Sequence, residues 1–340
     1  MIDNKELIPI SILTGFLGSG KTTLLNQLLS SPELADTAVL INEFGEIGLD
    51  HLLVNAVDEE IVLLESGCVC CSVRDDFIRS LLMLFNKREK QEIPAFQRVI
   101  LETTGIADPI AIHELILSDK EISQRYGCKD IITVVDAVYG ENNLDRHLEA
   151  VKQVSVADQI VISKTDLIDK PHIKNLEDRL HKLNPMASRL HAGSNPVDPN
   201  TLFNRNSSEP NIKPNSWPGN KHIQENTYPD AHFSSSHDHR FSTFCLSWPE
   251  AIEWDEFVAW LETLLIVRGD SIHRLKGLLS IRGEKRPTLI QGVQHSFYPP
   301  TKLDKWPHDK AQTELVFITS DFSKQAAIKS LENILDVSVE

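Results

Sequence analysis

The chain has 340 residues, enough to bury a sizeable core and, at about 150 residues for each domain, to form two domains. Its formal net charge of −15 disfavours a nucleic-acid partner and makes metal cations the more natural one. No apolar run approaches the roughly 18 residues of a membrane span, and the start lacks a basic and then apolar leader, so the sequence predicts a cytoplasmic protein with no membrane partner.

Residues 15–22 match the pattern G-x-x-x-x-G-K-[ST], between an apolar run at 7–13 and an amphipathic run at 23–29. The spacing predicts a strand, a phosphate-binding loop and a helix, in which glycines let backbone N–H groups approach the phosphates. Lys21 would reach the β- and γ-phosphate oxygens, and the Thr22 hydroxyl would bind Mg²⁺. The nucleotide-binding residues predicted in this stretch are Gly15, Gly18, Ser19, Gly20, Lys21, Thr22 and Thr23.

Short apolar runs alternate with helical patterns along the first half of the chain. Helical spacing at 77–85 and around 147–156 separates the runs. The alternation predicts an α/β domain of the P-loop NTPase class, with a doubly wound, mainly parallel sheet. The runs predicted as its further strands are residues 37–42, 61–64, 98–102, 131–135 and 159–162.

Acidic residues follow two of these strands. The loop at 42–50 carries Glu43 and Asp50 where open α/β sheets place ligand contacts, although a solvated acidic loop is the alternative. Glu102 ends a strand three residues before Gly105, which resembles a Walker-B and switch-II element. Either Glu102 or Asp50 would order the attacking water or the Mg²⁺ shell, and the sequence does not separate them.

Residues 163–166, S-K-T-D, directly follow the last of these strands and are close to the N-K-x-D guanine motif of GTPases. Asp166 would accept the N1–H and N2–H of guanine, a donor pair that adenine lacks, and so select GTP over ATP. Ser163 replaces the usual Asn, and its shorter hydroxyl would lose or weaken one contact worth about 1 kcal/mol, which makes a modest affinity for guanine the expectation. Ser163, Lys164 and Asp166 are therefore predicted to bind the base, with residues 184–187 as the candidate loop over it.

Residues 196–239 are rich in Asn, Ser, Pro and Gly, which indicates a flexible linker. His237-Asp238-His239 in this linker is a candidate transient metal site, against the alternative of a solvated loop. Beyond the linker, the order strand, helix, three strands and helix predicts a small α+β domain with an antiparallel sheet. The elements predicted there are residues 241–246, 254–265, 276–281, 288–294, 314–318 and 323–335.

Three of the five cysteines, Cys68, Cys70 and Cys71, lie within four residues. Thiolates are soft ligands that suit Zn²⁺ or Cu(I), and a helix start beside a bound cation would lower their pKa. Three cysteines so close need a further ligand, for which Glu43 is the first candidate, with water or a partner's residue at an open position. Buried apolar cysteines and a redox switch are the alternatives.

In their order and spacing these motifs resemble the CobW-like family of metallochaperone GTPases, with C-x-C-C as the specific part. The last hundred residues look like that family's C-terminal domain. By this resemblance the protein would hydrolyse GTP and load Zn²⁺, or Co²⁺ or another metal as in some relatives, into a client metalloprotein. The resemblance is carried by residues 15–22, 42–45, 65–71, 102–105 and 163–166 and by the histidine-bearing linker.

The sequence therefore predicts a GTPase domain at 1–195, a linker at 196–239 and a C-terminal domain at 240–340, with GTP, Mg²⁺ and Zn²⁺ as ligands. The rivals are a GTP-binding thiol switch that moves no metal and a P-loop kinase, which S-K-T-D disfavours. The client, the physiological metal and the oligomeric state, with a dimer as one option, are left open. The predicted catalytic residues are Lys21, Glu102 and Asp50, and the predicted metal ligands are Glu43, Cys68, Cys70 and Cys71.

Overall fold

The structure is a computed structural model. It describes residues 7–42, 63–65, 73–194, 196–203, 241–307 and 311–335, with Val337 and Val339. The chain divides into two compact units. The first consists of Met1–Asn143, Ala157–Lys174 and Ser188–Asn204, and the second of Leu144–Val156, Asn175–Ala187 and Arg205–Glu340.

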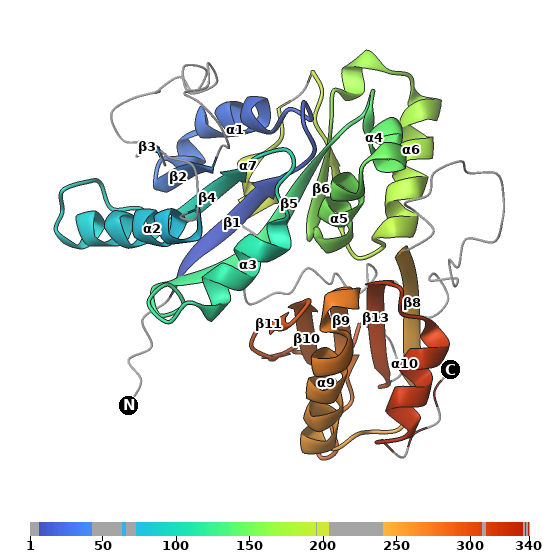
Figure 1. The fold of residues 1–340 in the computed structure, drawn as a ribbon. Coiled ribbons are helices and arrows are strands. Elements are labelled where there is room, and N and C mark those ends of the chain that lie inside the picture. The colour runs from blue at the N-terminus through green and yellow to red at the C-terminus, as the bar shows by residue number, and fades with distance from the viewer. Residues whose placement is uncertain are drawn as a thin grey trace. The chain divides into compact units, whose positions relative to one another are not determined.

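The first unit contains a seven-stranded sheet in the order β3-β2-β4-β1-β5-β6-β7 (Figure 1). Every neighbouring pair in this sheet is parallel. Its central strands are apolar and almost wholly buried, as parallel strands covered on both faces must be. The strands are β1 (Ile8–Thr14), β2 (Thr37–Asn42), β3 (Leu63–Glu65), β4 (Arg98–Thr103), β5 (Tyr126–Asp136), β6 (Gln159–Ser163) and β7 (Ser188–His191).

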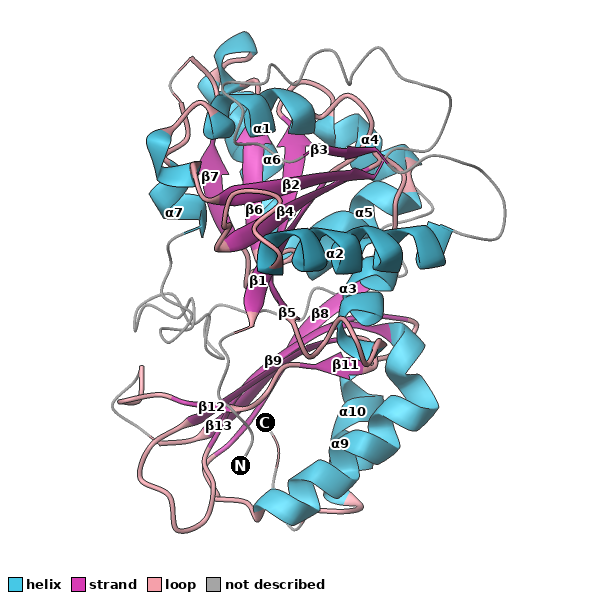
Figure 2. Cartoon of the chain, turned by 90° about the vertical axis from the view of Figure 1, so that its left-hand side faces the viewer, coloured by secondary structure: helices cyan, strands magenta, loops and turns pink. Residues whose placement is uncertain are grey.

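Helices cover both faces of this sheet. The chain moves from β1 to β2 through α1 (Lys21–Leu29) in one direction, and from β4 to β5 through α3 (Pro109–Ser118) in the other. Because such crossovers are right-handed, the two directions place the helices on opposite faces. Thus α1 and α7 (Pro199–Phe203) share one apolar cluster with the sheet, and α2 (Val73–Glu89) lies with α3 on the other face (Figures 1 and 2).

The second unit contains a six-stranded antiparallel sheet in the order β11-β10-β9-β13-β8, with β12 paired to β10. Helices α9 (Trp254–Arg268) and α10 (Lys324–Glu332) lie on the same side of this sheet, over a cluster of buried aromatic and aliphatic residues (Figure 2). The strands are β8 (Phe241–Trp248), β9 (Ile272–Leu279), β10 (Thr288–Val293), β11 (Ser296–Phe297), β12 (Thr301–Lys302) and β13 (Thr313–Ser320).

Three further helices connect strands of the first sheet: α4 (Gly140–Arg146), α5 (Leu148–Val156) and α6 (Lys170–Leu183). The predicted fold class, a doubly wound parallel sheet followed by an antiparallel α+β domain, is confirmed. Sequence analysis did not predict α3, α4, α6, α7, β7, β11 or β12, and α7 lies in the stretch predicted as linker. β11 and β12 are two-residue strands, too short for any periodicity to mark them.

Candidate functional site

The loop from β1 to α1 has the conformation that its glycines permit. Gly15 has φ of 144°, and a Cβ atom there would lie 2.2 Å from the carbonyl oxygen of Val134, so only glycine fits. The loop then closes on itself through a hydrogen bond of 3.1 Å from the N–H of Ser19 to the carbonyl of Phe16. The first N–H groups of α1 have no partner within the helix, and they lie at the switch point of the sheet, an arrangement of the kind that binds anions.

The side chain of Lys21 lies inside this loop. It is only 8% exposed, and its Nζ donates hydrogen bonds to the carbonyl oxygens of Gly15 at 2.9 Å and Phe16 at 3.3 Å. Two backbone carbonyls therefore hold the ammonium inside the loop, where it would form an ion pair with a bound phosphate group.

Thr22 and Glu102 meet next to this loop. Glu102 is on β4 opposite Leu13 of β1, and it is 4% exposed. The Thr22 hydroxyl donates a hydrogen bond of 2.6 Å to Oε1 of Glu102. A hydroxyl and a buried carboxylate placed together are oxygen donors of the kind that Mg²⁺ prefers, so this pair fits the predicted Mg²⁺ site. Asp50, the alternative to Glu102, lies outside the described residues.

The chain after β4 comes very close to the phosphate-binding loop. A Cβ atom on Gly105 would lie 2.6 Å from the backbone nitrogen of Leu17, so glycine is required for this approach. One residue pair fixes the two strands beneath it, because the Thr103 hydroxyl donates to the Thr14 hydroxyl at 2.9 Å. The stretch predicted as a switch-II element thus contacts the loop where a γ-phosphate would bind.

The S-K-T-D stretch also contacts the phosphate-binding loop. The Ser163 hydroxyl donates to the carbonyl of Ser19 at 2.6 Å, and Nζ of Lys164 donates to the carbonyl of Gly18 at 2.8 Å. The serine hydroxyl therefore donates its hydrogen to the protein backbone. Two successive side chains of the base motif hold two successive carbonyls of the phosphate-binding loop.

Asp166 is exposed at the carboxyl edge of the sheet, in a short 3₁₀ turn, Thr165–Leu167. The chain that follows β7 lies against it. A Cβ atom on Gly193 would be 3.2 Å from Oδ1 of Asp166, and the N–H of Thr165 donates to the carbonyl of Ala192 at 3.3 Å. Asp166 is therefore free to face a base, with the segment after β7 beside it.

The prediction that residues 184–187 form the loop over the base was wrong. These residues precede β7, whereas the segment beside Asp166 follows it. Asn184 is fully buried, and its amide donates to the carbonyl of Val154 at 2.8 Å while its Oδ1 accepts the N–H of Ala187 at 3.0 Å. It is a structural turn residue.

Two family descriptions together match most of the chain. Residues 9–191 match the CobW/HypB/UreG nucleotide-binding domain, and residues 241–335 match the cobalamin synthesis protein cobW C-terminal domain. The chain belongs to the CobW/HypB/UreG family. The predicted family and the predicted GTPase class are thereby confirmed, since relatives in this family are named as GTPases.

The relatives of this CobW/HypB/UreG chain include zinc chaperone YjiA of Escherichia coli (strain K12), 33% identical over 92% of this chain and 93% of YjiA. Zinc-regulated GTPase metalloprotein activator 1 of Schizosaccharomyces pombe is 34% identical over 53% of this chain and 44% of that protein. The crystal structure of Zn(II)-bound YjiA GTPase has a TM-score of 0.71 and 28% identity, over 97% of this chain and 99% of that one. A Zn(II)-bound triple mutant of YjiA, with one glutamate and two cysteines replaced by alanine, has a TM-score of 0.72 and 27% identity over the same shares.

Sequence reasoning missed two residues of the site in this family member. One is Asp136, whose Oδ2 lies 2.6 Å from Nζ of Lys164, and the other is Gly193 beside Asp166. Asp136 is the last residue of a buried strand and Glu102 the last but one, and this similar position at a strand end is the signal that could have found Asp136.

The predicted metal ligands Glu43, Cys68, Cys70 and Cys71 lie outside the described residues, as do the histidines of the linker. Among the residues that the structure does describe, no group of three or more His, Cys, Asp or Glu side chains is arranged to hold a metal ion. The same described ranges contain no helix long and apolar enough to cross a membrane.

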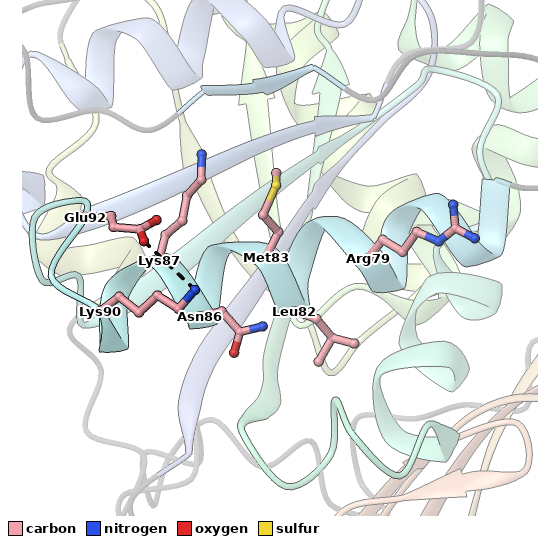
Figure 3. A pocket seen from close by; sticks show the side chains of 7 residues that line it. All are labelled: Arg79, Leu82, Met83, Asn86, Lys87, Lys90 and Glu92. Atoms are coloured by element: carbon pink, nitrogen blue, oxygen red, sulfur yellow. Dashed lines mark ion pairs between the residues drawn. The ribbon is translucent and has the colours of Figure 1, made fainter.

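A shallow groove of about 400 Å³ runs along the outer side of α2 (Figure 3). It combines basic and apolar side chains at helical spacing, and Lys90 in it lies 4.0 Å from Glu92. None of its lining residues belongs to the nucleotide-binding set, so the groove is separate from that site. The lining residues are Arg79, Leu82, Met83, Asn86, Lys87, Lys90 and Glu92.

Proposed function

We propose that this protein is a GTP-hydrolysing metallochaperone, which binds Zn²⁺ through its C-x-C-C element and delivers it to a client metalloprotein in the cytoplasm. The observation that supports this most is the contact of S-K-T-D with the phosphate-binding loop, in a chain whose relatives are named zinc chaperones. Phosphate, Mg²⁺ and base contacts then belong to one site. Nothing observed favours the thiol switch that moves no metal.

Hydrolysis in this proposal depends on charge stabilisation and positioning. Lys21, held by two carbonyls, stabilises the negative charge that develops on the β- and γ-phosphate oxygens. Thr22 and Glu102 would hold Mg²⁺, which when bound neutralises phosphate charge. Glu102 also accepts a hydrogen bond, and so can orient the hydroxyl or water next to it. Asp166 selects guanine by accepting its N1–H and N2–H.

The zinc site would lie beside this nucleotide site at the same edge of the sheet. Strands β2 and β3 are parallel neighbours, with Ile41 opposite Glu65. Glu43 follows β2 by one residue, and Cys68 follows β3 by three. Since parallel strands end at the same edge, the last described residues before Glu43 and before Cys68 are neighbours at one edge of the sheet. This supports Glu43 as the additional ligand to the thiolates.

The family matches leave residues 192–240 unmatched between them. This supports a GTPase domain, a linker and a C-terminal domain from residue 240. The predicted linker at 196–239 starts too early, because α7 packs into the apolar cluster of the first unit, so the GTPase domain extends to Phe203 and the linker follows it. A triple mutant of YjiA with one glutamate and two cysteines replaced is still Zn(II)-bound. The test of the zinc site therefore includes variants of the linker histidines.

Chelator competition for Zn²⁺ tests the proposal, with a non-hydrolysable GTP analogue or GDP bound. We expect one Zn²⁺ for each wild-type chain, and a loss of affinity of at least a hundredfold when Cys68, Cys70 and Cys71 become serine, since a serine hydroxyl stays protonated. The control is His237→Ala with His239→Ala, which should leave the affinity unchanged.

The same titration tests control by the nucleotide. We expect the affinity for zinc to be about tenfold higher with the GTP analogue bound than with GDP bound. By linkage, zinc must raise the affinity for the analogue, relative to GDP, by the same factor. Equal zinc affinities in the two states would contradict GTP-controlled delivery. Unchanged zinc in the triple serine variant would move the site to other ligands.

A further inference from the structure

Asp136, the last residue of β5, is a buried carboxylate next to the base motif. It is 3% exposed, and its Oδ2 lies 2.6 Å from Nζ of Lys164. Its Oδ1 accepts hydrogen bonds from the N–H groups of Val138 at 2.7 Å and Tyr139 at 3.3 Å. Both oxygens are thus partnered, which is the condition under which a buried charge is tolerated.

The ion pair determines where the Lys164 ammonium lies. A lysine has a long flexible stem, and its ammonium is strongly hydrated when nothing holds it. Here the side chain is 35% exposed, yet Nζ is held between the Asp136 carboxylate and the carbonyl of Gly18 at 2.8 Å. The Lys164 backbone has φ of 57°, a left-handed conformation that is unfavourable for a residue with a Cβ atom. Several contacts therefore hold this residue in one arrangement.

We propose that Asp136 is a positioning residue that fixes Lys164, and through it the base motif, against the phosphate-binding loop. This rests on the proposed function, because it concerns how GTP is bound. A nucleotide must contact Asp166 and the phosphate-binding loop at once. If the two are held at a fixed separation, the complex needs no further ordering when the nucleotide binds, and affinity rises. A ligand that contacts only the phosphate-binding loop gains nothing from that separation.

Through its charge alone, Asp136 would lower the affinity for phosphate-containing ligands, whereas through positioning it would raise the affinity for GTP. Replacing the carboxylate by an amide leaves the Lys164 charge without its anion, close to the place where phosphates bind. A nearby positive charge attracts phosphate, so by charge alone the variant would bind every anionic ligand more tightly. Weaker binding of GTP, without weaker binding of a bare phosphate chain, is thus a signature of positioning.

The test is calorimetric titration of Asp136→Asn with a non-hydrolysable GTP analogue and with inorganic triphosphate, both with Mg²⁺. Asparagine is nearly the same size as aspartate, and its carbonyl can still accept the Val138 and Tyr139 N–H groups. We expect affinity for the GTP analogue to fall about tenfold, as for loss of a hydrogen bond between charged groups, and affinity for triphosphate not to fall. The matched control is Glu284→Gln, which breaks an ion pair of the same 2.6 Å length in the antiparallel unit.

A double-mutant cycle tests whether Asp136 acts through Lys164. Lys164→Met should weaken binding of the GTP analogue, and adding Asp136→Asn should change it less than twofold further, because the partner is already gone. The double variant carries no unpaired buried charge, and in Lys164→Met the Asp136 carboxylate keeps the Val138 and Tyr139 N–H groups as donors. Comparing these two variants therefore still tests the proposal if Asp136→Asn alone does not fold.

Three results would overturn the positioning role. Asp136→Asn could lose equal affinity for the GTP analogue and for triphosphate, or lose no affinity for the analogue. It could also lower the affinity for the analogue a further tenfold in the Lys164→Met background. A wild-type protein that binds triphosphate but not the GTP analogue would instead overturn the proposed function.

Discussion

The two sheets of this protein use polar and apolar contacts in different ways. At the carboxyl edge of the parallel sheet, the candidate site side chains are held by one or two polar partners each, as Thr22 is by Glu102 and Lys164 is by Asp136 and the Gly18 carbonyl. The antiparallel sheet instead packs one face into an apolar cluster, where the rings of Phe244 and Phe317 stack with centroids 5.1 Å apart.

This difference separates function from stability. A polar contact at the carboxyl edge of the parallel sheet orients one group and contributes about 1 to 3 kcal/mol to the free energy of unfolding. A buried aromatic ring adds much to that free energy and orients nothing outside the core. Substitutions in the first region should change activity more than stability, and substitutions in the second should do the reverse.

The largest effect is expected for Lys21→Ala. Removing the charge that stabilises the transferring phosphate should lower GTP turnover by about a thousandfold, which is several kcal/mol in the barrier. The melting temperature and the circular dichroism spectrum should stay close to the wild type, because the ammonium donates its hydrogen bonds of 2.9 and 3.3 Å to carbonyls of the loop and not to the apolar core. Lys302→Ala, at an exposed ion pair, is the control and should leave turnover unchanged. Wild-type turnover in the Lys21 variant would refute the assignment.

Phe317→Ala should have the opposite profile. The ring is fully buried in the cluster of the antiparallel sheet, and its loss leaves a cavity that should cost about 4 kcal/mol of stability. Denaturant unfolding followed by aromatic circular dichroism should show the lower midpoint, while the affinity for a GTP analogue stays within twofold. Val316→Ala, on the other face of the same strand, is the matched control and should cost less because it removes a smaller side chain. A large loss of GTP affinity in folded Phe317→Ala would show that nucleotide binding at the parallel sheet depends on the core of the antiparallel sheet.

The same contrast explains what the sequence could predict. The strand before residue 15 and the helix after it are local patterns, so spacing alone predicted the phosphate-binding loop. Lys164, Ser163 and Asp166 were predicted as base-binding residues from a motif of four neighbours. The contact of Lys164 with Asp136 joins residues 28 positions apart, and no local pattern shows which loops meet.

Elements with weak patterns were missed for a related reason. Helix α6 buries only Leu176, Leu180 and Leu183 among its described side chains, within an otherwise polar sequence. β7 is a four-residue strand with no fully buried side chain, so the turn residues before it were taken as the loop over the base. Tertiary contacts, which decide both cases, are not contained in short-range periodicity.

A buried acid in the parallel sheet should make stability depend on pH. Burial, with Asp158 nearby, raises the pKa of Asp130 from 3.8 to about 6. Between these values the folded chain keeps a proton that the unfolded chain releases, so stability falls as pH rises through this window, and the loss is complete above pH 6. Asp130→Asn cannot ionise and can still contact Gln159, so it should gain about 2 kcal/mol at pH 8 relative to wild type. Urea unfolding at pH 5 and pH 8 measures this, with fully exposed Asp304→Asn as the control.

The smallest expected effect sharpens the contrast within the site itself. Asp166 is exposed and contributes little to packing, yet it alone would distinguish guanine from adenine. In Asp166→Asn an amide donor replaces one acceptor and faces a guanine donor, so the preference for GTP over ATP in competition binding should fall about tenfold. Asp169→Asn, three residues further and paired with His172 at the surface, should leave that preference unchanged.

The chemistry of the base also predicts that Asp166→Asn gains affinity for a different nucleotide. Xanthine carries a carbonyl oxygen where guanine carries its amino group, so the amide of Asp166→Asn could donate to it. We therefore expect the variant to bind xanthosine triphosphate better than the wild type does, while its affinity for inorganic triphosphate stays the same. A variant that loses GTP and triphosphate together, with no gain for xanthosine triphosphate, would place the base elsewhere and leave Asp166 as a residue that only supports the loop.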